Sequence, residues 1–469
     1  MFATSQHAHF IGIGGIGMSG IAEILLNLGM KVSGSDLRRT TVTDRLAVLG
    51  ATVFEGHNAA NVAGATVVVI SSAVNPANPE VVEAHARKIP VIQRAEMLAE
   101  LMRLKYGIAI AGMHGKTTVT SMVAAVLAAG NLDPTVVVGG RVDALGSNAR
   151  LGKSQYLVAE ADESDRSFLK LSPILSVVTN IDREHMDTYR DMIDVEDTFV
   201  DFMDRVPFYG MIVACNDDEP LRALLPRLRR RYVTYGKREG SDFRLTAATT
   251  ELQCGATKPL SRFGIEFNGK PLGEFCLHVP GAHNILNATA AIAVGIGLEI
   301  PVYSIQYALE TFRGVDRRFQ LRGEVDGIRV VDDYGHHPTE IRATLEAARQ
   351  VTDGKIHVIF QPHRFTRTQA LLEEFAGSFA DADNLFVLDI YPASEQPIPG
   401  ITGELVAQKV AANGRPAVFV SSFADAVTMV SSTAKSGDLI MTLGAGNVSQ
   451  LGPQIVEALQ SRHATQSTS

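Results

Sequence analysis

An apolar run that passes through a glycine turn into a helical pattern, at residues 108–121, most constrains how this chain folds. The turn holds Gly112 and Gly115, which let backbone N–H groups converge on phosphate oxygens. A helix that begins near Lys116 points its positive end at the same place. The Lys116 ammonium suits the β- and γ-phosphates of a nucleotide, and the Thr117 hydroxyl suits Mg²⁺. The segment therefore predicts a strand, a phosphate-binding loop and a helix within a parallel α/β sheet.

The spacing of the two glycines separates this loop from the common nucleotide-binding motif. Only Met113 and His114 stand between Gly112 and Gly115, whereas the common motif has four residues there. The short loop weakens a generic NTPase assignment and favours a particular family. The alternative is a glycine turn that only leads into a buried helix and binds nothing.

The rest of the chain divides into three units, in keeping with a length of 469 residues. Residues 1–106 alternate short apolar runs with helical stretches, which predicts a Rossmann-like domain. Residues 107–312 predict a mostly parallel sheet with a small antiparallel sheet beside it. Residues 313–469 predict a second Rossmann-like domain, which begins with a hairpin that turns at Asp326-Gly327. The expected fold class is α/β with three domains.

A second glycine-rich turn lies near the start of the chain. Gly12-Ile-Gly-Gly-Ile-Gly17 follows a predicted strand and opens a helix, and Asp36 ends the next strand. This pattern matches the dinucleotide fingerprint, in which the turn approaches a pyrophosphate and the acid binds a ribose hydroxyl. A UDP-sugar carries both groups, and so does NAD. A turn that packs helix on strand without a ligand is the third interpretation.

Acidic and imidazole side chains follow two apolar strands near the phosphate loop. Glu160 lies near the carboxyl end of one strand, where a parallel sheet offers Mg²⁺ an oxygen ligand. His185 follows the next, and it either ligates a second metal ion or makes only a structural hydrogen bond. The neighbouring acids Asp162, Glu163 and Asp165 are expected in a solvated loop.

Charge and cysteine content narrow the range of partners. The chain has 43 basic and 51 acidic residues, and its net charge of −8 gives no reason to expect nucleic acid or an anionic membrane as a partner. The cysteines Cys215, Cys254 and Cys276 are too scattered for a disulfide framework or a zinc knuckle. No apolar segment reaches membrane-spanning length. We expect a cytoplasmic protein without membrane insertion, either a monomer or a weak homodimer.

Four segments in order along the chain resemble the Mur ligase family, whose members form amide bonds at the expense of ATP. They are residues 111–118, 160–165, 179–187 and 283–288. The resemblance covers nearly the whole chain, and Met113 departs from it where a threonine is usual. Three further segments, residues 9–19, 332–340 and 361–368, are similar to the branch that joins L-alanine to UDP-N-acetylmuramate.

The resemblance implies a place for each substrate. ATP is expected at Gly112, Met113, His114, Gly115, Lys116, Thr117, Thr118, Asn284, Asn287, Arg318 and Asp332. The UDP substrate is expected at Gly14, Gly15, Ile16, Gly17, Met18, Ser19, Asp36, Ser71 and Arg94. L-Alanine is expected at Tyr334, His336, Arg364 and Arg367. Mg²⁺, or Mn²⁺ in its place, is expected at Thr117, Glu160 and His185, and the catalytic residues are expected to be Lys116, Glu160, His185 and His336.

The expected reaction makes an amide through an acyl phosphate. ATP would phosphorylate the muramyl carboxylate, and the amine of L-alanine would then attack the activated carbonyl. Arg364 and Arg367 would hold the α-carboxylate of the amino acid, and His336 would take up the proton of its ammonium group. The alternatives are a recycling ligase that attaches a tripeptide, an NAD-dependent oxidoreductase, and a nucleotide-regulated binding protein without catalysis.

Overall fold

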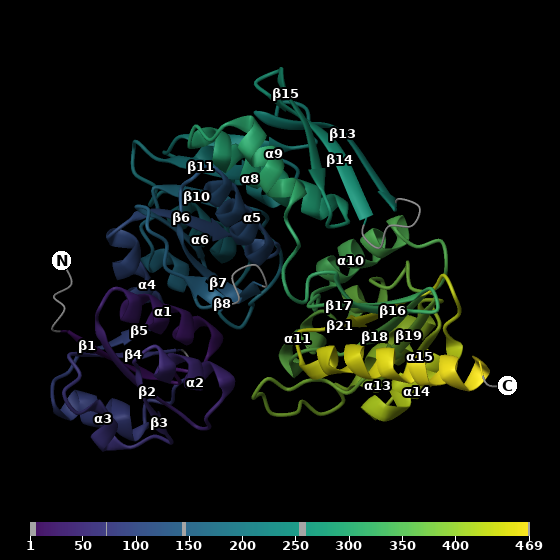
Figure 1. Ribbon diagram of the computed structural model, residues 1–469, viewed down its shortest axis with the longest axis horizontal. Coiled ribbons are helices and arrows are strands. Elements are labelled where there is room, and N and C mark those ends of the chain that lie inside the picture. The colour runs from purple at the N-terminus through teal and green to yellow at the C-terminus, as the bar shows by residue number, and fades with distance from the viewer. Residues whose placement is uncertain (1–5, 72, 143–146, 253–258, 468–469) are drawn as a thin grey trace. The chain divides into compact units, whose positions relative to one another are not determined.

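The computed structural model describes residues 6–71, 73–142, 147–252 and 259–467, which form three β-sheets with flanking helices (Figure 1). The chain divides into two compact units, which we call the first and the second unit. The first unit comprises residues 1–247, 263–275 and 286–312, and the second comprises residues 248–262, 276–285 and 313–469. Alternating strands and helices confirm the predicted α/β class.

The N-terminal sheet is parallel and has the strand order β3-β2-β1-β4-β5. Its strands are β1 (His7–Ile11), β2 (Lys31–Asp36), β3 (Thr52–Glu55), β4 (Val67–Ile70) and β5 (Val91–Gln93). The helices α1 (Ile16–Asn27), α2 (Thr41–Val48), α3 (Pro79–Ala86) and α4 (Arg94–Arg103) follow β1, β2, β4 and β5. The order of strands reverses beside β1, and such a reversal places a ligand site at the carboxyl edge of a sheet.

The middle sheet has ten strands in the order β15-β14-β13-β12-β11-β10-β6-β9-β7-β8. They are β6 (Tyr106–Ala111), β7 (Thr135–Val142), β8 (Ser147–Arg150), β9 (Tyr156–Glu160), β10 (Leu175–Val178), β11 (Met211–Cys215), β12 (Tyr232–Gly236), β13 (Phe243–Leu252), β14 (Pro259–Phe267) and β15 (Lys270–Leu277). Strand β6 pairs in parallel with both β9 and β10, so the residues that follow these three strands meet at one edge.

Among the described residues, five α-helices accompany this sheet. They are α5 (Lys116–Ala129), α6 (Met192–Met203), α7 (Glu219–Leu224), α8 (Ala282–Gly297) and α9 (Val302–Glu310). The strands β14 and β15 form a hairpin through Asn268 and Gly269, whose φ angles of 49° and 75° suit a two-residue turn. The antiparallel strands predicted for residues 242–279 therefore extend the edge of the parallel sheet.

The C-terminal sheet has the order β16-β17-β21-β18-β19-β20. Its strands are β16 (Gln320–Val325), β17 (Ile328–Asp333), β18 (Ile356–Phe360), β19 (Asn384–Val387), β20 (Ala417–Phe419) and β21 (Leu439–Leu443). Its helices are α10 (Pro338–Gln350), α11 (Phe365–Ala370), α12 (Leu372–Ala376), α13 (Gly403–Ala412), α14 (Phe423–Thr433) and α15 (Leu451–Ser467). The hairpin at Asp326-Gly327 is confirmed by the antiparallel pairing of β16 with β17, and the other strands pair in parallel.

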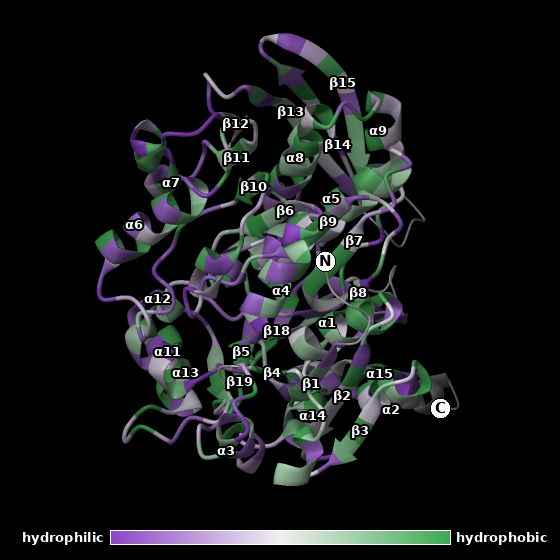
Figure 2. Ribbon diagram, turned by 90° about the vertical axis from the view of Figure 1, so that its left-hand side faces the viewer, coloured by the Kyte–Doolittle hydropathy of each residue, from purple (hydrophilic) through white to green (hydrophobic). Residues whose placement is uncertain are grey.

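Apolar side chains fill both faces of the C-terminal sheet. Val331 of β17 belongs to one buried cluster and Val330 to the other, as the two-residue period of a strand requires. Figure 2 shows hydrophobic residues concentrated in the strands and hydrophilic residues in many of the loops. Among the described residues, none of the helices combines the length and the apolar character needed to cross a bilayer.

Candidate active site

The loop between β6 and α5 has the conformation predicted for a phosphate-binding turn. Gly112 and Gly115 have φ angles of 128° and 85°, a region that other residues rarely adopt. A Cβ atom on Gly112 would lie 2.0 Å from Thr179 Oγ1, so the backbone passes too close to β10 for any side chain. The first hydrogen bond of the helical ladder runs from Val119 N to Gly115 O. The N–H groups of residues 115–118 therefore precede the ladder, and they are the donors that α5 offers a phosphate.

The residues that follow β10 hold this loop in place. Asn180 Oδ1 accepts a hydrogen bond from His114 N at 2.8 Å, and Asn180 O accepts one from Met113 N at 3.3 Å. Thr179 Oγ1 and Asn180 Nδ2 donate to His114 O at 2.6 and 3.1 Å. The N–H groups of Met113 and His114 are thus bonded within the protein, and Met113 is buried. These two positions therefore shape the loop and do not offer their N–H groups to a phosphate.

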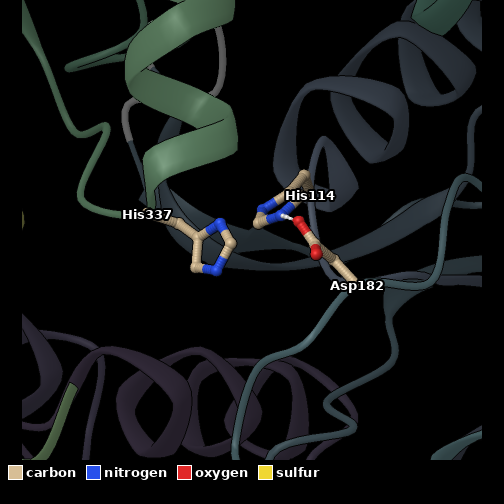
Figure 3. Close-up of side chains that lie close together, drawn as sticks. All are labelled: His114, Asp182 and His337. Atoms are coloured by element: carbon tan, nitrogen blue, oxygen red, sulfur yellow. Dashed lines mark hydrogen bonds and ion pairs between the residues drawn. The ribbon is translucent and has the colours of Figure 1, made fainter. Parts of the chain in front are cut away.

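The His114 side chain is fixed as well. Its Nε2 lies 2.9 Å from Asp182 Oδ2, and Figure 3 shows this pair. Figure 3 also labels His337, a residue of the second unit whose Nδ1 accepts a hydrogen bond from Thr339 N at the start of α10. The backbone and the side chain of His114 thus both bind the loop to the segment after β10.

Lys116 folds back over the loop. Its Nζ donates to Gly112 O at 2.7 Å and to Met113 O at 3.0 Å, and it pairs with Glu163 Oε1 at 2.8 Å. Burial opposes the charge of the ammonium group, but the carboxylates of Glu163 and Glu160 outweigh that effect and raise the pKa of Lys116 above its usual value. Lys116 is therefore a permanent cation at the loop, as a phosphate-binding lysine must be.

Glu160 lies where the sequence predicted an oxygen ligand for a metal ion. It ends β9, and its Oε1 and Oε2 both lie 3.1 Å from Thr117 Oγ1. Thr117 itself stands in the first turn of α5, so the hydroxyl and the carboxylate approach each other from the ends of two neighbouring elements. The arrangement brings together the two residues expected to share one Mg²⁺.

Glu163 corrects the prediction of a solvated acidic loop. Its side chain is only 1% exposed, and its Oε2 is buried without a hydrogen-bond partner. The chain doubles back after Glu163, since Arg166 has a φ angle of 60° and Tyr189 Oη donates to Glu163 O at 2.6 Å. Asp162 is half-buried and Asp165 is exposed, so the prediction holds for Asp165 alone.

His185 lies beside this carboxylate. Its Nε2 is 3.5 Å from Glu163 Oε1, and its φ angle of 57° turns the chain sharply. A threonine hydroxyl, two carboxylates, one of them with an unpartnered buried oxygen, and one imidazole make a donor set of mostly hard oxygen ligands. The residues present therefore fit Mg²⁺ or Mn²⁺.

Asn287 packs against the phosphate loop from α8. A Cβ atom on Gly115 would lie 2.8 Å from Asn287 Oδ1, so the amide side chain reaches the loop only because that position is glycine. Asn284 lies one turn earlier, and its Nδ2 donates to Pro280 O at 2.7 Å. The Asn284 side chain thus bonds to the chain that enters α8.

The glycine turn after β1 is held by the end of β2. Ser35 O accepts hydrogen bonds from Gly12 N at 2.8 Å and Ile13 N at 3.0 Å, and Asp36 Oδ2 accepts one from Gly14 N at 2.9 Å. Asp36, which the sequence assigned to a ribose, thus binds the turn in this structure. Met18 and Ser19 are buried in α1, and Ser71, which follows β4, is half-buried. Ile16 is the first residue of α1, and its side chain lies outside the described part of the structure.

Arg94 lies beside the same turn. A Cβ atom on Gly17 would lie 2.9 Å from Arg94 Nη1, so the guanidinium group packs directly on the backbone at the start of α1. Arg94 Nη2 also pairs with Asp162 Oδ2 at 3.1 Å. A cation beside a glycine turn and a helix N-terminus suits a pyrophosphate.

In the second unit, four rings form a row on the segments that follow β17, β18 and β19. Tyr334 and His336 have ring centroids 5.5 Å apart, His336 and His363 are 5.8 Å apart, and His363 stacks on Tyr391 at 5.5 Å. The guanidinium groups of Arg317 and Arg318 lie 4.9 and 5.1 Å from the centre of the Tyr334 ring. The predicted neighbours Tyr334 and His336 therefore do lie together.

The two predicted carboxylate-binding arginines stand at the start of α11. Arg367 Nη1 donates to His363 Nδ1 at 3.1 Å, and Arg364 Nε lies 3.9 Å from Glu395 Oε1. Burial, together with the nearby His336 and Arg367, lowers the pKa of His363 to about 3. A neutral His363 accepts a hydrogen bond from Arg367 over the whole physiological pH range.

His336 and Asp332 have partners within the second unit. His336 Nδ1 lies 3.2 Å from Glu340 Oε2, and Glu340 Oε1 lies 3.8 Å from Arg318 Nη1. Asp332 is fully buried and accepts hydrogen bonds from Arg322 Nη2 at 3.0 Å and Thr442 Oγ1 at 2.7 Å. The Asp332 carboxylate is therefore heavily engaged inside the protein.

Three features of the site were absent from the sequence prediction. Thr179 and Asn180 clamp the phosphate loop, Glu163 pairs with Lys116, and His363 holds Arg367. Thr179 and Asn180 directly follow a buried strand, and polar residues at that position indicate a possible contact with the phosphate loop. Glu163 and His363 gave no local sign, because their roles depend on burial by distant segments.

Family models match most of the chain. The Mur ligase family catalytic domain matches residues 7–106, the Mur ligase middle domain matches residues 110–295, and the Mur ligase glutamate ligase domain matches residues 317–446.

Curated relatives and solved structures agree with these matches. The UDP-N-acetylmuramate–L-alanine ligase of Koribacter versatilis is 68% identical over 98% of this chain and 99% of its own length. The corresponding ligase of Acidobacterium capsulatum is 66% identical over the same shares. The structure of the UDP-N-acetylmuramate–alanine ligase of Thermotoga maritima has a TM-score of 0.81 at 32% identity, over 97% of this chain and 99% of that one. A murein peptide ligase of Psychrobacter arcticus, at 24% identity and a TM-score of 0.68 over 97% and 98% of the two chains, shares the fold.

Proposed function

The chain belongs to the Mur ligase family, and from this premise we propose that it is an ATP-dependent ligase that joins L-alanine to the carboxylate of UDP-N-acetylmuramate in peptidoglycan precursor synthesis. The observation that carries the chemistry is the phosphate loop, with Lys116 and Thr117 beside Glu160, Glu163 and His185. The choice of L-alanine rests on the relatives that align with nearly the whole chain.

Each of the three domains has its own substrate in this proposal. Residues 1–106 bind the UDP substrate through Gly14, Gly15, Ile16, Gly17, Met18, Ser19, Asp36, Ser71 and Arg94. Residues 107–312 bind ATP, and residues 313–469 bind the amino acid. We propose that the protein works in the cytoplasm as a monomer or weak homodimer. Besides contacting the UDP substrate, Asp36 is proposed to hold the shape of the glycine turn, because its carboxylate accepts a hydrogen bond from Gly14 N.

The ATP site is proposed to use the donors at the start of α5 for the phosphates, together with Lys116 and Thr118. Asn284, Asn287, Arg318 and Asp332 are proposed to complete nucleotide binding. Thr117, Glu160 and His185 would hold Mg²⁺ or Mn²⁺, and the bound ion neutralises charge on the phosphoryl oxygens. Lys116 supplies a fixed positive charge at the same phosphates, and its role is electrostatic.

The reaction proceeds in two steps. A carboxylate oxygen of the muramyl group attacks the γ-phosphorus of ATP, and ADP leaves, which gives an acyl phosphate. The amine of L-alanine attacks the carbonyl carbon, the amide bond forms and inorganic phosphate leaves. Arg364 and Arg367 hold the α-carboxylate, Tyr334 and His336 line the amino-acid site, and His336 accepts a proton from the incoming ammonium group.

Phosphate release under defined substrate combinations tests the proposal. The protein should release phosphate from ATP only when UDP-N-acetylmuramate and L-alanine are both present. Lys116→Met should abolish the release, whereas Lys153→Met, which changes an exposed lysine, should leave it intact. Release with a tripeptide but not with L-alanine would identify a recycling ligase instead. NADH oxidation without phosphate release would exclude a ligase.

A further inference from the structure

A fully buried carboxylate lies under the glycine turn of the N-terminal sheet. Glu80, in the first turn of α3, has no exposed surface. Its Oε2 accepts a hydrogen bond from Ser35 Oγ at 2.6 Å, and its Oε1 accepts one from Asn61 Nδ2 at 2.5 Å and one from Asn58 N at 3.4 Å. His57 Nδ1 and His9 Nε2 lie 3.3 and 3.7 Å from Oε2.

A carboxylate without exposure is costly unless the protein satisfies it. Burial alone would raise the pKa of Glu80, but the nearby His9 imidazole and the hydrogen bonds from Ser35 and Asn61 outweigh burial and lower it to about 2. Glu80 is therefore an anion at neutral pH, and its hydrogen bonds have the strength of charge-assisted ones. The side chains that donate to the Glu80 carboxylate are therefore held more firmly than side chains in an apolar core.

The hydrogen-bond partners of Glu80 come from the end of one strand and from the loop that follows another. Ser35 lies near the end of β2, Asn58 and Asn61 follow β3, and Glu80 itself follows β4. The turn after β1 joins them through Ser35, whose carbonyl accepts the hydrogen bonds from Gly12 N and Ile13 N. One carboxylate thus links the end of β2 with the segments that follow β3 and β4, and Ser35 O in turn holds the turn after β1.

We propose that Glu80 is a positioning residue for the uridine-nucleotide site, which through Ser35 holds the Gly12–Gly17 turn in the shape that receives the pyrophosphate. Glu80 is fully buried and does not contact the substrate; it acts on the backbone that does. This inference rests on the proposed function, since it presumes that the turn binds UDP-N-acetylmuramate. Loss of the carboxylate weakens binding of that substrate alone, because ATP and L-alanine are assigned to other parts of the chain.

Steady-state kinetics of Glu80→Gln, with each substrate varied in turn, tests the inference. Glutamine keeps the shape of the side chain and removes its charge. We expect KM for UDP-N-acetylmuramate to rise about tenfold or more, with kcat and the KM values for ATP and L-alanine changed less than about twofold. A residue that only stabilises the fold would lower the melting temperature and leave KM unchanged, and that result would overturn the inference.

Two serines of β2 provide a matched pair should Glu80→Gln fail to fold. Ser35→Ala removes the hydroxyl that binds Glu80, whereas Ser33→Ala removes a hydroxyl that binds His9 Nδ1 at 2.8 Å and His7 Nε2 at 2.7 Å. Both serines are buried. Ser35→Ala should raise KM for UDP-N-acetylmuramate more than Ser33→Ala, which reaches Glu80 only through His9; a KM that Ser35→Ala leaves unchanged would refute the inference. Calorimetric titration of the unmodified protein separates the two proposals, since a protein that binds no UDP-N-acetylmuramate contradicts the function itself.

Discussion

The ion pair between Lys116 and Glu163 sets the charge of the phosphate loop before a nucleotide arrives. The Glu163 side chain is 1% exposed and the Lys116 side chain is 16% exposed. Each group therefore neutralises the charge of the other in a place that water barely reaches. Lys116 also donates to two carbonyl oxygens of the loop, and all three contacts hold its ammonium group over the turn. In the proposed ATP complex, a phosphate would take over part of the role of Glu163, because it would supply negative charge at the same place.

Glu163→Gln should therefore destabilise the free protein more than the nucleotide complex. The substitution leaves the buried lysine without its counter-charge, and we expect a loss of about 2 to 4 kcal/mol in the free energy of unfolding. Much of that loss should return when a non-hydrolysable ATP analogue is bound. Urea unfolding with and without the analogue measures both values. Asp165→Asn, at an exposed acid of the same segment, is the control, and an equal loss in both states would contradict the prediction.

Lys116 and Glu163 also mark how far the sequence predicts the site. Lys116 and Thr117 were recognisable because a glycine turn between a strand and a helix has one common use. Glu160 was recognisable because it ends a strand next to that turn. Glu163 was misjudged, because its burial depends on the backbone turn at Arg166 and on Tyr189, which lies far along the chain. Local sequence patterns indicate which charged side chains a site contains, but tertiary packing decides which of those side chains are shielded from water.

The start of α7 joins two segments of the middle sheet through one side chain. Asp218 Oδ1 accepts a hydrogen bond from Leu221 N at 2.9 Å, which caps the helix, and one from Ile181 N at 3.3 Å. Burial, with a further contribution from Asp182, raises the pKa of Asp218 to about 6. The cap therefore fixes the segment after β10, which in turn holds the phosphate loop.

The raised pKa of Asp218 predicts how stability changes with pH. Folding favours the protonated acid, so this group adds stability below its unfolded pKa, and that contribution is lost as pH rises toward about 6. An asparagine at this position would keep both hydrogen bonds without the charge, and asparagine caps helices as well as aspartate does. Because Asp218 is partly exposed, we expect Asp218→Asn to stabilise the protein by about 1 to 2 kcal/mol at pH 7.5.

Urea unfolding between pH 5 and pH 8 checks this prediction. The gain from Asp218→Asn should shrink as pH falls through about 6, while Asp191→Asn, at the exposed cap of α6, should show no such trend. A variant that is less stable than the unmodified protein at pH 7.5 would show that the charge of Asp218 contributes to the cap.

Strands, helices and hairpins were largely predictable because their signals are local. The Asp326-Gly327 turn gave the β16–β17 hairpin, and alternating apolar runs gave the parallel sheets. The order of strands was not predictable: β21 lies between β17 and β18, although more than seventy residues separate it in sequence from β18. Such strand pairings depend on how several helices cover both faces of a sheet, and a local sequence pattern does not indicate this arrangement.

The whole chain combines three family domains with two compact units. Residues 7–106 and most of the middle domain share the first unit, and ion pairs join them, between Arg94 and Asp162 and between Lys170 and Glu96. The proposed UDP-binding residues lie in the first unit, and the proposed amino-acid residues lie in the second. Each unit has buried aromatic residues of its own, among them Phe199 in the first and Phe379 in the second.

Scanning calorimetry should therefore resolve two unfolding transitions, and UDP-N-acetylmuramate should act on one of them. Phe199→Leu should lower only the transition of the first unit and Phe379→Leu only that of the second, which assigns the two peaks. A substrate present at about a hundred times its Kd stabilises the unit that binds it by about 2.7 kcal/mol. UDP-N-acetylmuramate alone should thus raise the peak that responds to Phe199→Leu and leave the other in place. If it raised only the peak that responds to Phe379→Leu, the assignment of the UDP site to residues 1–106 would be wrong.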